Sequence, residues 1–432
     1  MRQFTFIYAI YVVSIVFLSA CSQAEQVPEA TIQPERIATE TAVSIPTPTE
    51  ELEMSNIRIG TPLIVDHTVY FGTDVGSFYA YDLQTGQEKW RYDTGRLALL
   101  APLVENGRVY FGGESGNLYA LDSETGEEIW KFAAGEVDYQ IRDKYTNSIP
   151  TIQDGIIYFT SEDFNVYAVD VETGEEVWRF FLEEETQQAE TPIVDGILYV
   201  GSWNGYMFAI DVKTGHEVWR SQTDNYHTGQ IGFGNESFIP DQEVPEGERG
   251  SNQVPFVTVS PIITAELIYF VDWTGNLFAV DRATGVQVWR FKPETENLRN
   301  AGARFYMTMY DDLIYYTTFA DKHLYGVDRL TGEQVWHAAY DGWLDGPIPG
   351  KDHVAFLIEF PLGDNGFPNG FSFQVHALDL NTREILYTME DISLFPTVYE
   401  NTVVYGSVYG RIKSLDIFTG ELRWELELDL GS

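Results

Sequence analysis

The sequence is poor in cysteine and in basic residues. Cys21 is its only cysteine, so no disulfide can form within the chain. Lys and Arg number 26 against 66 Asp and Glu, which gives a formal net charge of −40. A surface this acidic repels nucleic acid and other polyanions. We therefore expect no nucleic-acid binding, and either a well-solvated surface or a basic partner.

The common catalytic motifs are missing as well. The chain has no Gly-rich phosphate loop, no Gly-x-Ser-x-Gly and no His-Glu-x-x-His. Its seven histidines are scattered, and His216 and His337 belong to the repeats described below. Their spacing does not predict a metal site. We therefore expect no catalytic residue and no metal ligand.

The N-terminus has the features of an export signal. Arg2 precedes an apolar run from Phe4 to Leu18, and Leu18-Ser19-Ala20-Cys21 follows. This ending resembles the bacterial lipobox, in which the cysteine thiol takes a diacylglycerol and becomes the new N-terminus. We expect a signal peptide over residues 1–20 and lipidation at Cys21. An uncleaved N-terminal anchor is the alternative, although the run is short for a membrane span.

The segment after the cysteine is unsuited to a core. Residues 21–55 are rich in Pro, Thr and Glu and contain few large apolar side chains, which is typical of a flexible acidic tether. The expected product is an exported, lipid-anchored protein of the cell envelope, on the periplasmic face or at the cell surface. Two or more acyl chains give a lasting anchor.

The rest of the chain is a repeat with a period of about 40 residues. Each copy has an apolar pair, Asp, two variable residues, Thr-Gly and a Trp four residues on, as in Asp122, Thr125-Gly126 and Trp130. Eight copies predict an all-β, eight-bladed β-propeller of four-stranded antiparallel blades over residues 56–432. The tryptophans expected to pack between blades are Trp90, Trp130, Trp178, Trp219, Trp289, Trp336 and Trp424, and Tyr387 replaces the seventh of the eight.

One copy shows the expected blade. Residues 101–104, 108–112, 117–121 and 128–132 form four strands, A to D, separated by Gly, Asn and Asp. Asp122 is expected to bond backbone N–H groups in its turn, and Gly126 to adopt positive φ. Every blade supplies its own four strands. Residues 55–59 are expected to add to the last blade and lock the ring.

The unit from Gly112 to Trp130 resembles the pyrroloquinoline-quinone (PQQ) type propeller repeat with its tryptophan-docking motif, and the resemblance covers about residues 57–430. Two groups share it: quinoprotein alcohol dehydrogenases and the lipoprotein propeller of the outer-membrane β-barrel assembly machinery. The first implies PQQ, a Ca²⁺ site, an Asp base and an adjacent cysteine pair. No cysteine follows Cys21, so we expect no cofactor, and PQQ with Ca²⁺ only under this alternative.

The second group fits the layout better. It implies a non-catalytic, monomeric scaffold that binds an envelope protein or peptide and meets the membrane only through its lipid. A surface carbohydrate- or ligand-binding lipoprotein is a further alternative.

Strand alternation puts the B–C turns and the D–A connections on one face. The long insertions, residues 134–147, 221–256 and 360–371, all fall there. We expect binding on this face, by aromatic anchors or sugar-stacking rings. A structural role, in which the rings cap the blade ends, is the alternative. The candidates are Trp203, Asn204, Tyr226, His227, Trp273, Arg304, Phe319, Phe367 and Tyr409.

Overall fold

A computed structural model describes the propeller region of the chain. The chain divides into two units, Met1–Leu52 and Glu53–Ser432, and all described residues belong to the second. They are residues 59–95, 101–113, 116–134, 149–161, 163–183, 191–223, 257, 260–272, 275–293, 306–318, 322–362, 373–389, 392, 396–407 and 411–427.

The first four blades each consist of four consecutive strands. Blade 1 contains β1 (Leu63–Val65), β2 (Thr68–Gly72), β3 (Ser77–Asp82) and β4 (Glu88–Asp93). Blade 2 contains β5 (Leu103–Glu105), β6 (Arg108–Gly112), β7 (Asn117–Asp122) and β8 (Glu128–Ala133). Blade 3 contains β9 (Thr151–Gln153), β10 (Ile156–Thr160), β11 (Asn165–Asp170) and β12 (Glu176–Phe181). Blade 4 contains β13 (Ile193–Val194), β14 (Ile197–Gly201), β15 (Tyr206–Asp211) and β16 (Glu217–Gln222).

The last four blades repeat this order. Blade 5 contains β17 (Ile262–Ile263), β18 (Leu267–Val271), β19 (Leu277–Asp281) and β20 (Gln287–Phe291). Blade 6 contains β21 (Met307–Tyr310), β22 (Leu313–Thr318), β23 (His323–Asp328) and β24 (Gln334–Ala339). Blade 7 contains β25 (Trp343–Pro349), β26 (Val354–Phe360), β27 (Gln374–Asp379) and β28 (Glu384–Met389). Blade 8 contains β29 (Thr397–Tyr399), β30 (Thr402–Gly406), β31 (Arg411–Asp416) and β32 (Leu422–Glu427).

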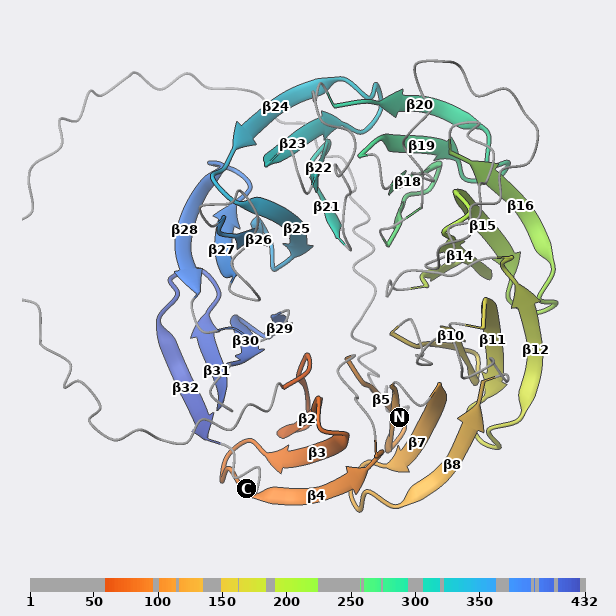
Figure 1. The fold of residues 1–432 in the computed structure, drawn as a ribbon, viewed down its shortest axis with the longest axis vertical. Coiled ribbons are helices and arrows are strands. Elements are labelled where there is room, and N and C mark those ends of the chain that lie inside the picture. The colour runs from red at the N-terminus through yellow and green to blue at the C-terminus, as the bar shows by residue number, and fades with distance from the viewer. Residues whose placement is uncertain are drawn as a thin grey trace, which may run out of the picture. The chain divides into compact units, whose positions relative to one another are not determined.

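The eight sheets stand around a ring, with the first strand of each blade toward the centre and the fourth at the rim (Figure 1). The predicted eight-bladed all-β propeller is confirmed, and every blade uses its own four strands. One detail differs from expectation. Ile59 forms an antiparallel bridge with Thr73 of blade 1, so at this residue the leading segment pairs with the first blade and not with the last. The described residues include no helix long and apolar enough to cross a membrane.

A cross-strand rung explains why each blade needs a small residue beside its Trp. Tyr110, Ala120 and Trp130 are register partners on neighbouring strands of blade 2. Because the alanine is small, the rings on either side of it reach each other, with centroids 5.8 Å apart. The same rung recurs in blade 3, where Tyr158 and Trp178 are 5.7 Å apart.

The tryptophans dock onto the next blade. The indole N–H of Trp90 donates to the carbonyl of Ser123 at 3.0 Å, and that of Trp130 to Val171 at 2.9 Å. In both cases the acceptor is the residue after the motif Asp. Trp178, Trp219 and Trp289 repeat the bond to Val212, Arg282 and Arg329 at 2.9–3.1 Å. Each of these five indoles thus bonds to the blade that follows it.

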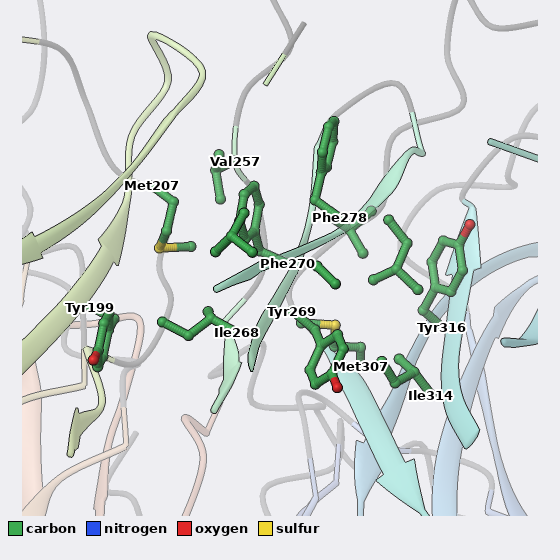
Figure 2. Close-up of a cluster of buried hydrophobic side chains, with 14 of the residues drawn as sticks. Tyr199, Met207, Val257, Ile268, Tyr269, Phe270, Phe278, Met307, Ile314 and Tyr316 are labelled. Atoms are coloured by element: carbon green, nitrogen blue, oxygen red, sulfur yellow. The ribbon is translucent and has the colours of Figure 1, made fainter. Parts of the chain in front are cut away.

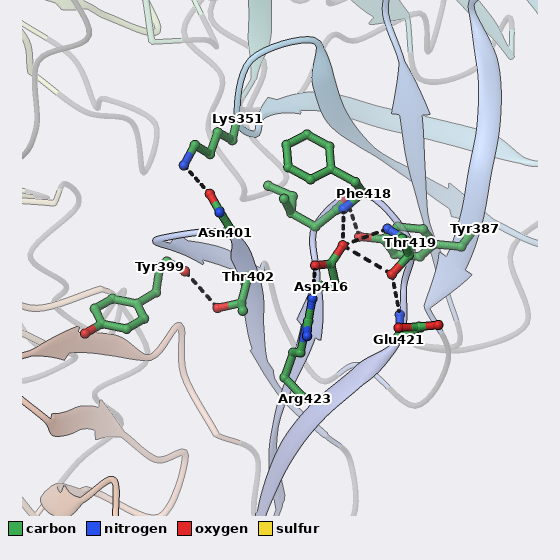
Figure 3. A network of polar contacts seen from close by, with 11 residues as sticks. Lys351, Tyr387, Tyr399, Asn401, Thr402, Asp416, Phe418, Thr419, Glu421 and Arg423 are labelled. Carbon is green, nitrogen blue, oxygen red and sulfur yellow. Dashed lines mark hydrogen bonds and ion pairs between the residues drawn. The ribbon is translucent and has the colours of Figure 1, made fainter.

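The motif turn is built to receive the ring. Asp122 Oδ1 accepts the backbone N–H groups of Glu124 and Thr125 at 3.0 and 2.8 Å. Gly126 has φ of +72°, and a Cβ added there would lie 2.7 Å from the Trp90 ring. Glycine is therefore required both by backbone conformation and by the close approach of the indole. Figure 3 shows the corresponding turn around Asp416 in blade 8.

The core lies between blades. One face of each sheet packs on the facing side of the next, as where Tyr70, Phe78 and Trp90 of blade 1 meet Phe111 and Tyr119 of blade 2. The largest cluster joins blades 4, 5 and 6 and is shown in Figure 2. At the ring closure, Ile59 and Phe71 share a cluster with Val404 and Ile412 of blade 8.

Blade 7 departs from the repeat. Arg383, with φ of +65°, stands at the motif glycine position, and its guanidinium lies 5.4 Å from the Trp336 ring centroid. In the part of the chain described, Trp336 makes no indole bond like those above. Tyr387 stands at the Trp position, and its hydroxyl donates to the Ile417 carbonyl at 2.9 Å, so it takes over docking on blade 8.

Trp424 packs at the ring closure, but its indole has no docking bond to the described residues of blade 1.

A largely buried carboxylate and imidazole of blade 7 hold the connection from blade 6. His376 Nε2 lies 3.0 Å from Glu359 Oε2, with side chains 7% and 14% exposed. The other oxygen of Glu359 accepts the N–H of Gly342 at 2.6 Å, and Thr388 Oγ1 lies 2.8 Å from His376 Nδ1. The pair thus fixes the short connection into β25. Half-buried Tyr340 lies near Glu359, and partial burial followed by that charge raises the pKa of its hydroxyl to about 12.

Candidate binding face at blades 3 and 4

Among the B–C turns of blades 1 to 6, which the structure describes in part or in full, one rule holds with two exceptions. Glycine occupies the last turn position with positive φ in blades 1, 2, 4 and 5, at Gly76, Gly116, Gly205 and Gly275. Blade 3 has Phe164 there, at φ of +69°, and blade 6 has Lys322, at +62°. The hydrogen bonds show that the positions correspond, because the Leu182 N–H donates to the Phe164 carbonyl just as Thr94 donates to Gly76.

Phe164 is thus a bulky residue in a conformation that favours glycine. A left-handed residue with a Cβ costs about 1–2 kcal/mol. Strain of this kind persists where the surrounding structure fixes it, and it gathers at functional sites. The ring of Phe164 is half-buried and is therefore accessible at the end of the blade.

A second phenylalanine lies beside it. Phe181, at the end of β12, is 58% exposed, and its ring centroid is 6.4 Å from that of Phe164. All seven other blades have small or polar residues at this place, three positions after the docking Trp or Tyr: Asp93, Ala133, Gln222, Lys292, Ala339, Glu390 and Glu427. A half-buried and an exposed ring side by side, at positions that the repeat gives to Gly and to small or polar residues, are unusual for a scaffold surface.

Leu182 connects this pair to blade 4. Its carbonyl accepts the Asn204 side-chain amide at 3.1 Å, and its N–H bonds the Phe164 carbonyl at 2.7 Å. The B–C turn of blade 4, which carries half-buried Trp203, is thereby held against the end of β12. We call Phe164 and Phe181, together with the adjoining turn that carries Trp203, the aromatic corner.

A charged group flanks the aromatic corner. Arg220 of β16 contacts Glu183, just after Leu182, at 3.3 Å and Glu217 at 2.6 Å. Its guanidinium also lies 4.9 Å from the Phe208 ring centroid. The hydrogen bond with Glu217, followed by other contacts, raises the pKa of Arg220, so this side chain stays charged. The cation and its carboxylates give the corner a polar rim.

Two of the residues predicted for binding lie in the described part. Trp203 belongs to the aromatic corner. Asn204 is 7% exposed and uses its amide internally, since its oxygen also accepts the Tyr206 N–H at 3.3 Å. Its place is between blades. The others, and the lipidation site, lie outside the described residues: Cys21, Tyr226, His227, Trp273, Arg304, Phe319, Phe367 and Tyr409.

Sequence reasoning missed Phe164 and Phe181, although the signal was present. Aligning the repeats puts Phe164 in a glycine column and Phe181 in a column of small and polar residues. The described residues contain no group of three or more His, Cys, Asp and Glu side chains that could hold a metal. The arrangement is suited to contact with another molecule.

Comparison with known proteins decides the family. A family model described as outer membrane protein assembly factor BamB matches residues 39–144, 94–232 and 246–344, together more than half of the chain. The chain belongs to this family. No curated protein has a matching sequence.

Solved structures agree with the fold of the BamB family. BamB from Moraxella catarrhalis has a TM-score of 0.60 and 16% identity, over 83% of this chain and 95% of that one. The computationally designed Ika8 protein has a TM-score of 0.59 and 14% identity, over 84% and 97%. Quinohemoprotein alcohol dehydrogenase from Comamonas testosteroni has a TM-score of 0.48 and 16% identity, over 88% and 68%. At these identities the likeness concerns the fold alone.

Proposed function

We propose that this protein is a non-catalytic scaffold of envelope protein assembly that works by binding a protein partner on the B–C face. Family membership supports the assembly role. The observation that carries the binding site is Phe164, which keeps an accessible ring at a left-handed position beside exposed Phe181. Rigid aromatic anchors with a polar rim are the usual centre of a protein interface.

A lipid anchor and a tether would attach the propeller to the membrane. Residues 1–20 direct export, Cys21 carries the lipid, residues 21–55 form the tether, and residues 56–432 the propeller. Tyr226, His227, Trp273, Arg304, Phe319, Phe367 and Tyr409 stay predicted contributors to the same face. A PQQ-dependent reaction has less support, because the cysteine pair that the dehydrogenase resemblance implies is absent.

The test is capture of partners from envelope extract by the full-length protein in detergent. Phe181→Ser removes an exposed corner ring, and Val288→Ser, on β20 and 53% exposed, is the matched control at an equally open site. Loss of one aromatic anchor costs about 2 kcal/mol of binding, or roughly 30-fold in affinity. We expect wild type and Val288→Ser to capture outer-membrane β-barrel proteins or their assembly components, and Phe181→Ser to lose them.

Equal capture by all three proteins would remove the aromatic corner from the proposal. Capture of no assembly protein, together with binding on a glycan array, would instead favour the carbohydrate-binding alternative. Sugar stacking uses the same exposed rings, so the array is run with the Phe181→Ser variant in parallel.

A further inference from the structure

Blade 6 brings two histidines together. His323 begins β23 and His337 lies on β24, and the strand register places them diagonally across the pair. Their ring centroids are 5.6 Å apart, with an angle of 49° between the planes. The other blades have no histidine at either position. At the place of His337 five of them carry a cation: Arg91, Lys131, Arg179, Arg220 and Arg290.

Both histidines also lie near the strand C ring of Tyr325. His323 stacks on it, with centroids 5.8 Å apart and an angle of 28° between the planes. In blades 2 and 3 the cation lies over the strand C ring, with Lys131 5.2 Å from Tyr119 and Arg179 5.6 Å from Tyr167. His337 is 6.3 Å from Tyr325, farther than it is from His323. The closer contact in blade 6 is therefore between the two imidazoles.

We propose that His323 and His337 bind a borderline divalent metal ion such as Zn²⁺, with water or another ligand completing the coordination. Zn–N bonds are about 2.0–2.1 Å, so a tetrahedral ion shared by two imidazoles separates their ring centroids by roughly 5 Å. The observed centroid separation of 5.6 Å is close to this value. His337 is exposed, so water reaches the site, and the net charge of −40 draws cations toward the protein.

Gln334 supplies the outer support that a metal-binding histidine needs. Its side-chain amide lies 2.9 Å from His337 Nδ1, which leaves Nε2 for the ion. When Nε2 binds metal, Nδ1 carries the proton, and a turned amide accepts it through its oxygen. The inference departs from the sequence-based expectation of no metal ligand, because only the pairing of β23 with β24 brings these distant residues together.

The experiment titrates Zn²⁺ into the full-length protein by calorimetry and follows the imidazole signals by NMR. We expect one site that shifts two of the seven histidines and is lost in His323→Ala and in His337→Ala. Gln334→Ala should bind about 10-fold more weakly. His216→Ala, which alters a histidine in a motif turn of blade 4, is the matched control and should bind like wild type.

Thermal unfolding with and without Zn²⁺ provides two further controls. Zn²⁺ should raise the unfolding temperature of wild type and not of the two variants, since only a ligand bound to the native state stabilises it. All variants should unfold like wild type without metal. Zn²⁺ binding that survives both substitutions, or that shifts no imidazole signal, would assign the ion to surface carboxylates and overturn the proposal.

Discussion

At the scale of single residues, the repeat separates scaffold from surface. Positions held in nearly every blade, such as Asp122 and Gly126, have internal partners in the motif turn. Phe164 and Lys322 do the reverse, because each places a side chain where the repeat uses glycine. Only Phe164 is accompanied by a second exposed ring. A departure from the repeat is therefore more informative about binding than a motif residue is.

The strain at Phe164 can be measured. Phe164→Gly and Phe164→Ala both remove the ring, but only Ala keeps a Cβ in the left-handed region. We expect the Gly variant to be about 1 kcal/mol more stable than the Ala variant in urea unfolding. Lys322→Gly and Lys322→Ala should differ by the same amount. Equal stabilities within the Phe164 pair would mean that the turn relaxes and stores no strain.

Gly126 tests the docking geometry. An alanine there meets the Trp90 ring at 2.7 Å and must hold φ of +72°. We expect Gly126→Ala to destabilise the protein by about 2 kcal/mol, through strain and displacement of the indole. Gly107→Ala has a similar φ of +74° but nothing within 4 Å, so it measures the backbone part alone. If the two variants lose the same stability, packing against Trp90 has no share in the cost.

At the scale of elements, the junctions between blades differ in how they are held. Most use an indole bond to the next blade, whereas blades 7 and 8 are joined by the hydroxyl of Tyr387. At the junction of blades 6 and 7, an apolar cluster that includes Tyr315 and Leu357 joins the blades, and Glu359 of blade 7 holds the connecting segment at Gly342. His376 stands where blade 2 has Tyr119 in strand C, so a hydrogen-bonded pair replaces an aromatic one.

Removing Glu359 should weaken that junction. Glu359→Ala leaves the N–H of Gly342 and the ring of His376 without their acceptor, at a cost of about 3 kcal/mol. Glu359→Gln keeps an acceptor oxygen and should lose less than half as much. Chemical denaturation of both variants checks this. An Ala variant as stable as the Gln variant would show that an acceptor oxygen at this position contributes nothing.

The blades were predictable from the sequence because their signals are local. Asp122, Gly126 and Trp130 mark a turn and a packing ring within nine residues, and the register of β7 and β8 follows from them. The aromatic corner was only half predictable. Trp203 stood out as a turn aromatic, but its neighbourhood depends on Leu182 bonding two turns at once. A contact that occurs at only one pair of blades leaves no periodic signal in the sequence.

At the scale of the whole molecule, the stability of the fold should depend on pH through the aspartates of the motif turns. Hydrogen bonds from Thr125 and its equivalents lower the pKa of the motif aspartates, and Arg423 is the main cause that lowers the pKa of Asp416 to about 2 (Figure 3). A carboxyl whose pKa is lower in the folded state than in the unfolded chain stabilises the fold fully at pH values above its unfolded-state pKa, which is about 4. This stabilisation is lost as the pH falls through the folded-state pKa.

We therefore expect the unfolding temperature first to rise and then to fall as the pH is lowered. Relief of self-repulsion raises stability as pH falls from 7 to about 5, since the net charge is −40. Stability then drops between about pH 4 and 2 as the motif aspartates are protonated. Arg423→Gln should make the loss of stability below pH 4 smaller, because the pKa of Asp416 moves back toward its usual range. A curve without a fall below pH 4 would contradict this account.

Photo-crosslinking in cells tests the central claim, binding through the aromatic corner, most directly. A photoreactive amino acid is placed at Phe181 of the full-length chain, and at Val288 for comparison, since both are more than half exposed. The account predicts an adduct with an outer-membrane protein or an assembly component from position 181 and none from position 288. No adduct from position 181, or the same adducts from both positions, would contradict it.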